Sequence, residues 1–312
     1  MNDTHDQVKG LLENIQKVFV GKPDAALWSV VSLLARGHLL IEDVPGIGKT
    51  LLGQALAKSI DASFRRIQFT NDLLPSDILG ITLVNAQDHS FEFKPGPIFS
   101  HIVLTDEVNR ATPKTQSAML EAMNDLQVTV DGRTHALHVP FMVIATQNPV
   151  EYHGTFPLPE AQLDRFLLRI RIGYPDSVNE KLILREGDLA QRLKDLKPVL
   201  SVEQVLALQD EADKVRMDDA LLDYIVAIAR ATRSAKGVKL GLSPRGSLAL
   251  CSAARALALA SGRDYCIPDD IKRAAVPVMS HRLLSDSNLY GLARIEESEY
   301  EVEALLQTVP SP

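Results

Sequence analysis

The chain has 312 residues, enough to bury a substantial core and most naturally divided between two domains. Its 33 Lys and Arg against 40 Asp and Glu leave a net charge of −7, which argues against sequence-independent binding of nucleic acid or of an anionic membrane. No apolar run approaches the roughly 18 residues of a membrane span, and the polar residues 1–6 are unlike a signal peptide, so we expect a cytoplasmic protein. Cys251 and Cys266 lie in apolar helical patterns and are expected to be buried small side chains.

Hydrophobic periodicity in the first half of the chain predicts strands that alternate with helices. Helical spacing covers residues 7–20, 24–36, 51–60, 74–78 and 113–126, and strand patterns cover 38–41, 64–69, 102–105, 141–145 and 167–172. Two hairpins are expected, one from 81–84 with 91–93 and another from 127–130 with 134–139, which turns at Asp131-Gly132. This alternation indicates an α/β fold with a parallel sheet that is covered by helices on both faces.

The strand signal ends near residue 176, and the second half of the chain has helical spacing. Helices are expected over 178–196, 202–215, 220–231, 245–261 and 269–284, with capping signals at Ser201, Ser243-Pro244 and Pro268-Asp269. We therefore predict an α/β domain at residues 1–174 and a smaller all-helical domain at 175–312. The acidic tail 286–312 is expected to hold a helix over 295–306, and the sequence assigns it no role.

A phosphate-binding loop is indicated between the strand at 38–41 and the helix that follows. Gly46 and Gly48 can take backbone conformations that direct N–H groups at a polyphosphate, and the new helix adds its positive N-terminal end. Lys49 would reach the β- and γ-phosphates, and the Thr50 hydroxyl would bind Mg²⁺. The alternative is a Gly/Pro turn before an ordinary helix. The predicted nucleotide-binding residues of this loop are Pro45, Gly46, Ile47, Gly48, Lys49, Thr50 and Leu51.

Asp43 stands where the general phosphate-loop pattern has glycine. Because Asp tolerates left-handed and turn geometry better than most residues, we expect the loop to form despite this departure.

Two adjacent acids follow the predicted strand 102–105, at the end where a parallel sheet presents ligands. Asp106 is expected to hold the Mg²⁺ that Thr50 touches, and Glu107 to accept a proton from the water that attacks the γ-phosphate. The alternative is a pair of surface acids that cap a helix N-terminus.

Three further polar residues stand near strand or helix ends. Asn148 follows the strand at 141–145 and could orient the attacking water, although Asn-Pro by itself is turn chemistry. Arg165 precedes the last strand, and Arg245 begins a helix in the second domain. Lone arginines of this kind are usually solvated or paired with surface acids.

These motifs occur in an order that resembles the MoxR family of AAA+ ATPases, over roughly residues 8–284. The resemblance rests on the segments EDVPGIGKT, LLPSDILG, FEFKPGPIF, TDEVNRATPKTQSAMLEAM, ATQNP, GTFPLPEAQLDRF and GLSPRG. It implies a P-loop AAA+ domain followed by an all-α lid. Arg165 is similar to the family's arginine finger, Asn148 to its first sensor and Arg245 to its second. Val20-Gly21 matches the place where relatives bind adenine.

The resemblance also gives the arginines a task. In a ring, Arg165 would face the nucleotide of a neighbouring subunit, so hydrolysis should depend on assembly, whereas Arg245 would bind the nucleotide of its own chain and couple phosphate loss to lid rotation. The two predicted hairpins are similar to the insertions that mark this group of ATPases.

The resemblance thus implies an oligomeric ATPase, a ring of six subunits, that uses ATP and Mg²⁺ to remodel protein clients, with von Willebrand factor A domain proteins as partners. A nucleic-acid motor is the alternative, and a nucleotide-switched binding module is a third reading. The net charge of −7 and the absence of a basic, aromatic run in either hairpin count against nucleic acid. His101, His138 and His153 are far apart in the sequence and are expected to be structural or exposed, not metal ligands.

Overall fold

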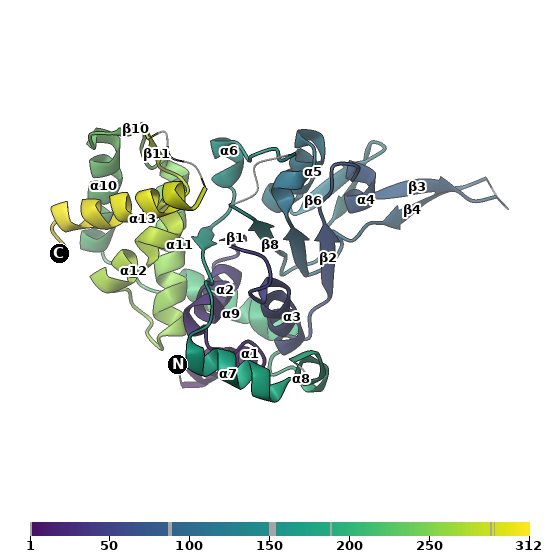
Figure 1. Ribbon diagram of the computed structural model, residues 1–312, viewed down its shortest axis with the longest axis horizontal. Helices are drawn as coiled ribbons and strands as arrows, with labels where there is room; N and C mark the ends of the chain where they lie inside the picture. Colours follow the sequence, from purple (N-terminus) through teal and green to yellow (C-terminus); the bar gives the residue numbers. More distant parts are fainter. Residues whose placement is uncertain (1, 87–88, 150–153, 188, 288, 290) are drawn as a thin grey trace.

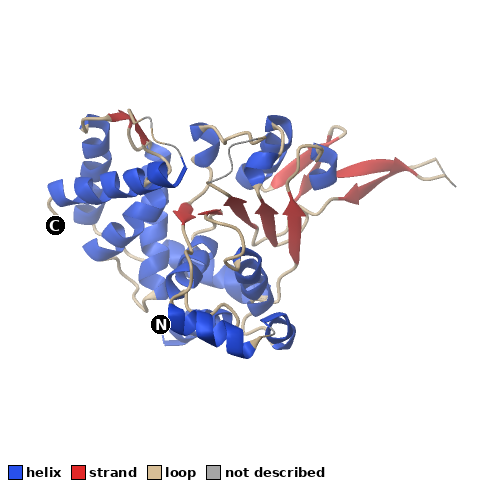
Figure 2. Cartoon of the chain, in the orientation of Figure 1, coloured by secondary structure: helices blue, strands red, loops and turns tan. Residues whose placement is uncertain are grey.

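The computed structural model describes residues 2–86, 89–149, 154–187, 189–287, 289 and 291–312. Its centre is a five-stranded sheet in the order β2-β5-β8-β1-β9, and every pairing is parallel. The strands are β1 (Leu39–Glu42), β2 (Phe64–Gln68), β5 (Ile102–Asp106), β8 (Met142–Gln147) and β9 (Leu168–Ile170). The predicted parallel α/β sheet is confirmed, with helices on both of its faces (Figures 1 and 2).

Side chains that alternate along the strands supply two separate cores. Leu39 and Ile41 of β1 face α1 (Asn2–Gln16), α2 (Pro23–Leu34) and α3 (Lys49–Ser59). Leu40 faces the other way, toward α4 (Pro75–Leu79) and α5 (Pro113–Asp125). Since successive side chains in a strand point to opposite faces, both cores follow from a short run of buried apolar residues.

Both predicted hairpins form, and they project from the α5 side of the molecule. The first hairpin consists of β3 (Gly80–Val84) and β4 (Phe91–Pro95). This hairpin extends far from the rest of the molecule (Figure 1). The second consists of β6 (Gln127–Val130) and β7 (Arg133–Ala136) and turns at Asp131 and Gly132, both with positive φ. Short elements, η1 (Val108–Arg110) and α6 (Glu160–Leu163), complete this half.

The second half is helical as predicted, with differences at its ends. The helices are α7 (Ser177–Glu186), α8 (Leu189–Asp195), α9 (Val202–Lys214), α10 (Asp219–Ser234), α11 (Pro244–Ala260), α12 (Pro268–Met279) and α13 (Gly291–Thr308). The single helix expected at 178–196 was wrong: α7 ends at Glu186, and the next residue, Gly187, has a positive φ, which is a helix-terminating conformation. The caps at Ser201 and Ser243 form as expected, each side-chain oxygen accepting a backbone N–H.

Two short strands in this half were not predicted. β10 (Val238–Leu240) pairs antiparallel with β11 (Leu284–Ser285), so α12 ends at Met279 instead of continuing to residue 284. Strands this short carry no readable periodicity, and their partner lies more than forty residues away in sequence. The pair ties the end of α10 to the segment before α13.

The acidic tail forms the longer helix α13, which crosses the end of β9 (Figure 1). Arg171, just beyond β9, pairs with Glu296 at 3.2 Å and with Glu299 at 2.8 Å. The buried Arg169 in β9 donates to the Ser298 hydroxyl at 2.7 Å. The tail is therefore fixed to the sheet by polar contacts that its sequence alone did not indicate.

Candidate functional site

The phosphate loop forms between β1 and α3 as expected. Gly46 and Gly48 have φ of 84° and 91°, in the left-handed region that favours glycine. A Cβ atom at Gly48 would lie 3.3 Å from the Phe19 ring, whereas one at Gly46 would meet nothing within 4 Å. Lys49 begins α3 and is buried, and its ammonium donates to the Asp43 carbonyl oxygen at 2.5 Å. The helix N-terminus and the two glycines thus form a cradle of backbone N–H groups.

Asp43 has a different role from the one expected. Asp43 is not one of the described non-glycine residues that have a positive φ, so its tolerance of left-handed geometry is not used. Its carboxylate instead accepts backbone N–H groups from Val44 at 2.8 Å, Ile172 at 2.7 Å and Gly173 at 2.6 Å. Charge-assisted bonds of this kind are strong, so Asp43 fastens the loop to the chain that follows β9.

Lys49 lies in a field of carboxylates. Burial lowers the pKa of its ammonium below the ordinary value, and the nearby carboxylates, Asp43 and Asp106 foremost, oppose that shift. Asp106 and Glu107 therefore lie within electrostatic reach of Lys49, at the carboxyl edge of the sheet. The donors available to a phosphate at this site are the Lys49 ammonium, the loop N–H groups and the N-terminal end of α3.

The acid pair is held by a hydroxyl group. Asp106 accepts from the Thr146 hydroxyl at 2.5 Å and from Arg66 at 2.5 Å. The same Thr146 oxygen accepts the backbone N–H of Glu107 at 2.9 Å. Because Thr146 is 1% exposed and lies on the neighbouring strand β8, it fixes both acids relative to the sheet.

Glu107 has a strained backbone and an engaged side chain. Its φ of 58° and ψ of 50° are left-handed, which is uncommon outside glycine and concentrates at functional sites. Its carboxylate accepts from Gln68 at 2.9 Å and pairs with Arg110 at 3.2 Å. Glu107 does precede the short helix η1, but its side chain makes no capping hydrogen bond, which speaks against the surface-cap alternative.

Sequence reasoning missed the residues that surround the acids: Arg66, Gln68, Arg110 and Thr146. Arg66 and Gln68 alternate on β2, and the register pairs Gln68 with Asp106. The alternation was readable from the sequence, but strand order and register were not, so their proximity to the acids was hidden.

Asn148 follows β8 and is 7% exposed. In the sheet, β8 lies between β5 and β1, and its residue Gln147 is in register with Glu42. Asn148 therefore lies at the same carboxyl edge as the acid pair and Lys49.

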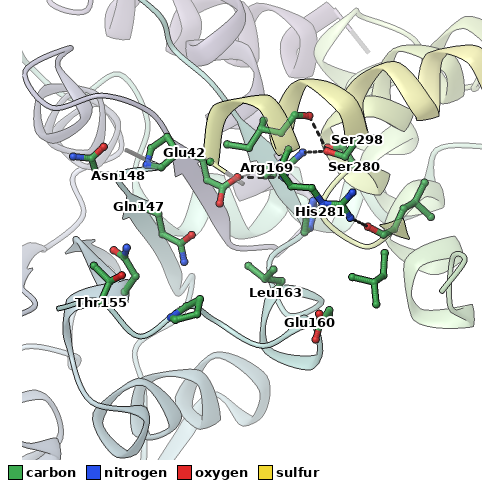
Figure 3. Close-up of a pocket in the computed structure, with 18 residues that line it drawn as sticks. Glu42, Gln147, Asn148, Thr155, Glu160, Leu163, Arg169, Ser280, His281 and Ser298 are labelled. Atoms are coloured by element: carbon green, nitrogen blue, oxygen red, sulfur yellow. Dashed lines mark hydrogen bonds and ion pairs between the residues drawn. The ribbon is translucent and has the colours of Figure 1, made fainter. Parts of the chain in front are cut away.

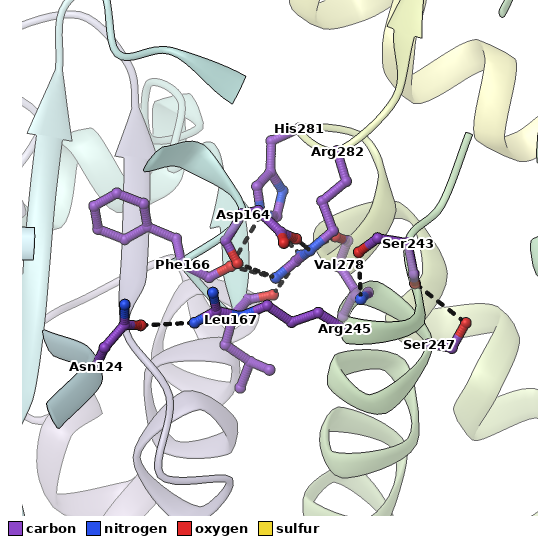
Figure 4. A network of polar contacts seen from close by, with 11 residues as sticks. Asn124, Asp164, Phe166, Leu167, Ser243, Arg245, Ser247, Val278, His281 and Arg282 are labelled. Carbon is purple, nitrogen blue, oxygen red and sulfur yellow. Dashed lines mark hydrogen bonds and ion pairs between the residues drawn. The ribbon is translucent and has the colours of Figure 1, made fainter. Parts of the chain in front are cut away.

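The structure does not bring the two arginines to this edge. Arg165 donates to the Leu120 carbonyl of α5, and Arg245 donates to the Asn124 side chain at 2.7 Å (Figure 4). α5 runs from the carboxyl edge back to the amino edge, where His38, just before β1, contacts the Met123 carbonyl at 2.9 Å. The expected contact of Arg245 with the nucleotide of its own chain is therefore not made in this conformation.

The segment matched to an adenine site lies beside the phosphate loop. Phe19 packs on Gly48, and Gly21, with φ of 81°, is close enough to Asn179 of α7 that a Cβ atom would lie 2.6 Å from it. Val20 and Gly21 thus sit between α7 and the loop, where a nucleoside could extend from bound phosphates.

The histidines that were considered as metal ligands lie elsewhere. The rings of His101 and His138 stack with centroids 5.1 Å apart, and His101 contacts the Ser63 hydroxyl at 2.8 Å. His153 lies outside the described residues. Within the described residues, no three His, Cys, Asp or Glu side chains gather as a metal cluster would require.

None of the helices in the described part of the chain combines the length and the apolar character that a membrane crossing requires.

Comparison with known proteins agrees with this geometry. Residues 38–168 match the ATPase family associated with various cellular activities (AAA), and residues 230–303 match the AAA lid domain. The chain is 51% identical to YeaC of Bacillus subtilis, an uncharacterised protein, over 99% of this chain and 96% of YeaC. It is 39% identical to Chaperone MoxR1 of Mycobacterium tuberculosis, over 99% of this chain and 83% of that protein.

A crystal structure of a candidate ATPase from Cytophaga hutchinsonii superimposes with a TM-score of 0.88 at 36% identity, covering 99% of this chain and 96% of that one. Sequence, fold and the residues at the carboxyl edge of the sheet lead to one assignment: the chain belongs to the MoxR family of AAA+ ATPases.

Proposed function

We propose that the protein hydrolyses ATP with Mg²⁺ at the carboxyl edge of its sheet. The observation that carries this proposal is the convergence of Lys49, Asp106 and Glu107 beside the N-terminus of α3. The loop amides and Lys49 bind the phosphates, and Thr50 and Asp106 hold the metal. Glu107 accepts a proton from the attacking water, which Asn148 orients.

The residues of the loop fit a triphosphate. The positive φ of Gly46 and Gly48 leaves the cradle open, and the Lys49 ammonium rests on a neutral carbonyl oxygen, from which a phosphate oxygen can readily draw it. Asp106 supplies a carboxylate oxygen of the kind that Mg²⁺ prefers. When bound, Mg²⁺ neutralises charge on the β- and γ-phosphate oxygens.

Glu107 must change partners before it can act as a base. In this conformation it accepts from Gln68 and pairs with the guanidinium of Arg110. A carboxylate engaged in this way is not free to accept a hydrogen bond from the attacking water. Release of Glu107 from these partners is therefore part of the proposed cycle.

The arginines at the amino edge act on a neighbouring subunit. Arg165 and Arg245 both contact α5 at the amino end of the sheet. The length of a strand, roughly 10 Å, separates this end from the carboxyl end, where Lys49 of the same chain lies. In a ring, which we propose to be hexameric, these cations meet the γ-phosphate of the adjacent chain. An arginine supplied in this way stabilises the charge of the transition state and makes hydrolysis depend on assembly.

The name of the relative Chaperone MoxR1 supports a protein client as the object of this work. We propose a cytoplasmic remodelling or maturation ATPase that acts with von Willebrand factor A domain partners. A pull-down with a Glu107→Gln variant, which retains ATP and therefore its clients, identifies them.

Binding and turnover are tested separately. Lys49→Ala is expected to lose most ATP affinity by calorimetry, whereas Glu107→Gln keeps ATP and loses phosphate release by a factor on the order of 10²–10⁴. Glu121→Gln, the same change at an exposed position of α5, serves as the matched control. Equal ATP affinity in Lys49→Ala and wild type would remove the loop from the site.

A further inference from the structure

A cavity lies beside the proposed nucleotide site, on the other face of the sheet. It has a volume of about 270 Å³ and is bounded by the ends of β1, β8 and β9, by α6 and by the segment from α12 to α13 (Figure 3). Glu42 and Gln147 line it, whereas their neighbours on the opposite face of the strands pack toward α3. The cavity is thus separated from the phosphate loop by the sheet, although Asn148 lies at the edge of both.

Buried polar atoms without a partner gather around this cavity. Four of the described residues that line the cavity have a buried polar atom without a partner: Gln147 (Nε2), Arg169 (Nε), Ser280 (Oγ) and His281 (Nδ1). Ser280 is 2% exposed, His281 is 5% exposed, and the side chain of Arg169 is 8% exposed. Since almost every buried polar atom in a native protein has a hydrogen-bond partner, four in one cavity indicate that something occupies it.

The unpartnered atoms specify the chemistry of the occupant. Gln147 Nε2 and Arg169 Nε can only donate, so the occupant must offer acceptor oxygens. The two other nitrogens of Arg169 each have a partner, since Nη1 pairs with Glu42 at 3.2 Å and Nη2 donates to Ser298 at 2.7 Å. Figure 3 shows the Gln147 amide directed into the space between Thr155 and Leu163.

Charge and wall composition narrow the choice further. Lining acids Glu42 and Glu160 balance the lining cations Arg169 and Arg294, so the wall is close to neutral. A carboxylate would add one negative charge to this wall, whereas a phosphate dianion would add two next to Glu42, so the monoanion costs less. The apolar part of the wall is formed mainly by Leu163, Leu283, Leu284 and Ile295, beside polar residues such as Asn109 and Thr155.

We propose that this cavity binds a small organic monocarboxylate, with the carboxylate on Gln147 and Arg169 and the hydrocarbon part against the leucines. The size agrees, because about 270 Å³ lies at the small end of ligand pockets. The site goes beyond the proposed ATPase function and does not depend on it.

The test is calorimetry on the full-length protein with acetate, propionate, lactate and pyruvate, and with inorganic phosphate as the dianion. At least one monocarboxylate is expected to bind one per chain with a Kd below about 1 mM. Gln147→Met removes the amide donor at nearly constant volume and should weaken that binding about tenfold or more. Gln162→Met is the matched control, since Gln162 also has a buried unpartnered atom but does not line the cavity.

A variant of the phosphate loop distinguishes the two sites. Binding that survives Lys49→Ala and is lost in Gln147→Met supports the proposal, and thermal melts without ligand verify that both variants fold. Binding lost in Lys49→Ala and retained in Gln147→Met would assign the anion to the phosphate loop and overturn the proposal. No binding by any of the four monocarboxylates at 10 mM, a concentration about tenfold above the expected Kd, also overturns it and leaves a water-filled cavity.

Discussion

The two ends of the central sheet handle charge in different ways. At the carboxyl end, Asp106 and Glu107 are held by partners from β2, β8 and η1 of the same chain, and Lys49 is fixed on the Asp43 carbonyl. At the amino end, the contacts that the structure describes for Arg165 and Arg245 are with neutral groups of α5, a backbone carbonyl and a side-chain amide. The first end is assembled within one chain, whereas the second presents two arginines whose described partners are neutral.

The difference supports the proposal that half of the ATPase site is built by folding and half by assembly. Asp164 and Arg282 show the contrast inside the same network, because Arg282 is almost fully buried and pairs with Asp164 at 2.7 Å (Figure 4). Burial lowers the pKa of Arg282 to about 10 despite that partner. Arg282 is thus held within the fold by an ion pair. Arg165 and Arg245 would each give up only a neutral partner on binding an anion.

The largest effect should come from the assembly half. Arg165→Ala is expected to reduce phosphate release by a factor on the order of 10³–10⁵, because a cation that stabilises the transition state is lost. ATP binding by the isolated chain should change little, since that arginine is away from its own loop. Phosphate release and ATP titration of Arg165→Ala are compared with Arg230→Ala, an exposed arginine on α10.

Mixed rings make this comparison of the two ends decisive. Co-assembly of Arg165→Ala with Glu107→Gln, verified by differential tags, should restore part of the activity, because some sites then combine an intact Glu107 with an intact Arg165 from the neighbour. If Arg165→Ala alone hydrolyses ATP normally, the amino end is not part of the site.

A second effect concerns His38, which is buried in its neutral form at the amino end. His38 is buried, accepts the Val143 N–H at 3.0 Å and contacts the Met123 carbonyl, so its neutral form fits both partners. Burial lowers the pKa of His38 to about 4 from an unfolded value near 6.5. The unfolded state therefore takes up the proton first, and stability falls as pH drops from 6.5 toward 4, by about 3 kcal/mol in total.

Urea unfolding at pH 7.5 and at pH 5 measures this dependence. The fall in unfolding free energy toward acid pH should be smaller in His38→Gln than in the wild type. It should be unchanged in His138→Gln, a substitution at an exposed position. The buried His281 has a pKa shifted in the same direction by burial and by Arg282, so some dependence remains in His38→Gln. If the pH dependence of stability in His38→Gln equals that of the wild type, His38 is not buried in its neutral form.

The smallest effect tests how firmly the carboxyl end is prebuilt. Thr146→Val removes the hydroxyl that joins Asp106 to the backbone of Glu107, and phosphate release should fall about ten- to a hundredfold. Thr105→Val is a matched control on the adjacent strand, because the buried Thr105 hydroxyl has no partner among the described residues and its loss should be neutral or stabilising. Equal rates in the two variants would mean that the acids need no such support.

The sequence by itself determined the parallel α/β core, the helical second half and the carboxyl-edge groups Lys49, Asp106 and Glu107. Each of these is a local signal, since strand and helix periods, glycine positions and strand-end acids are read within a few residues. Tertiary structure alone decided which distant groups meet: the register that sets Gln68 beside Asp106, the hydroxyl of Thr146 between two acids, and the docking of α13 on β9. It also decided that Arg245 faces α5 and not its own phosphate loop. Register, helix packing and the orientation of one half on the other depend on contacts between residues far apart in the chain, and no local pattern encodes them.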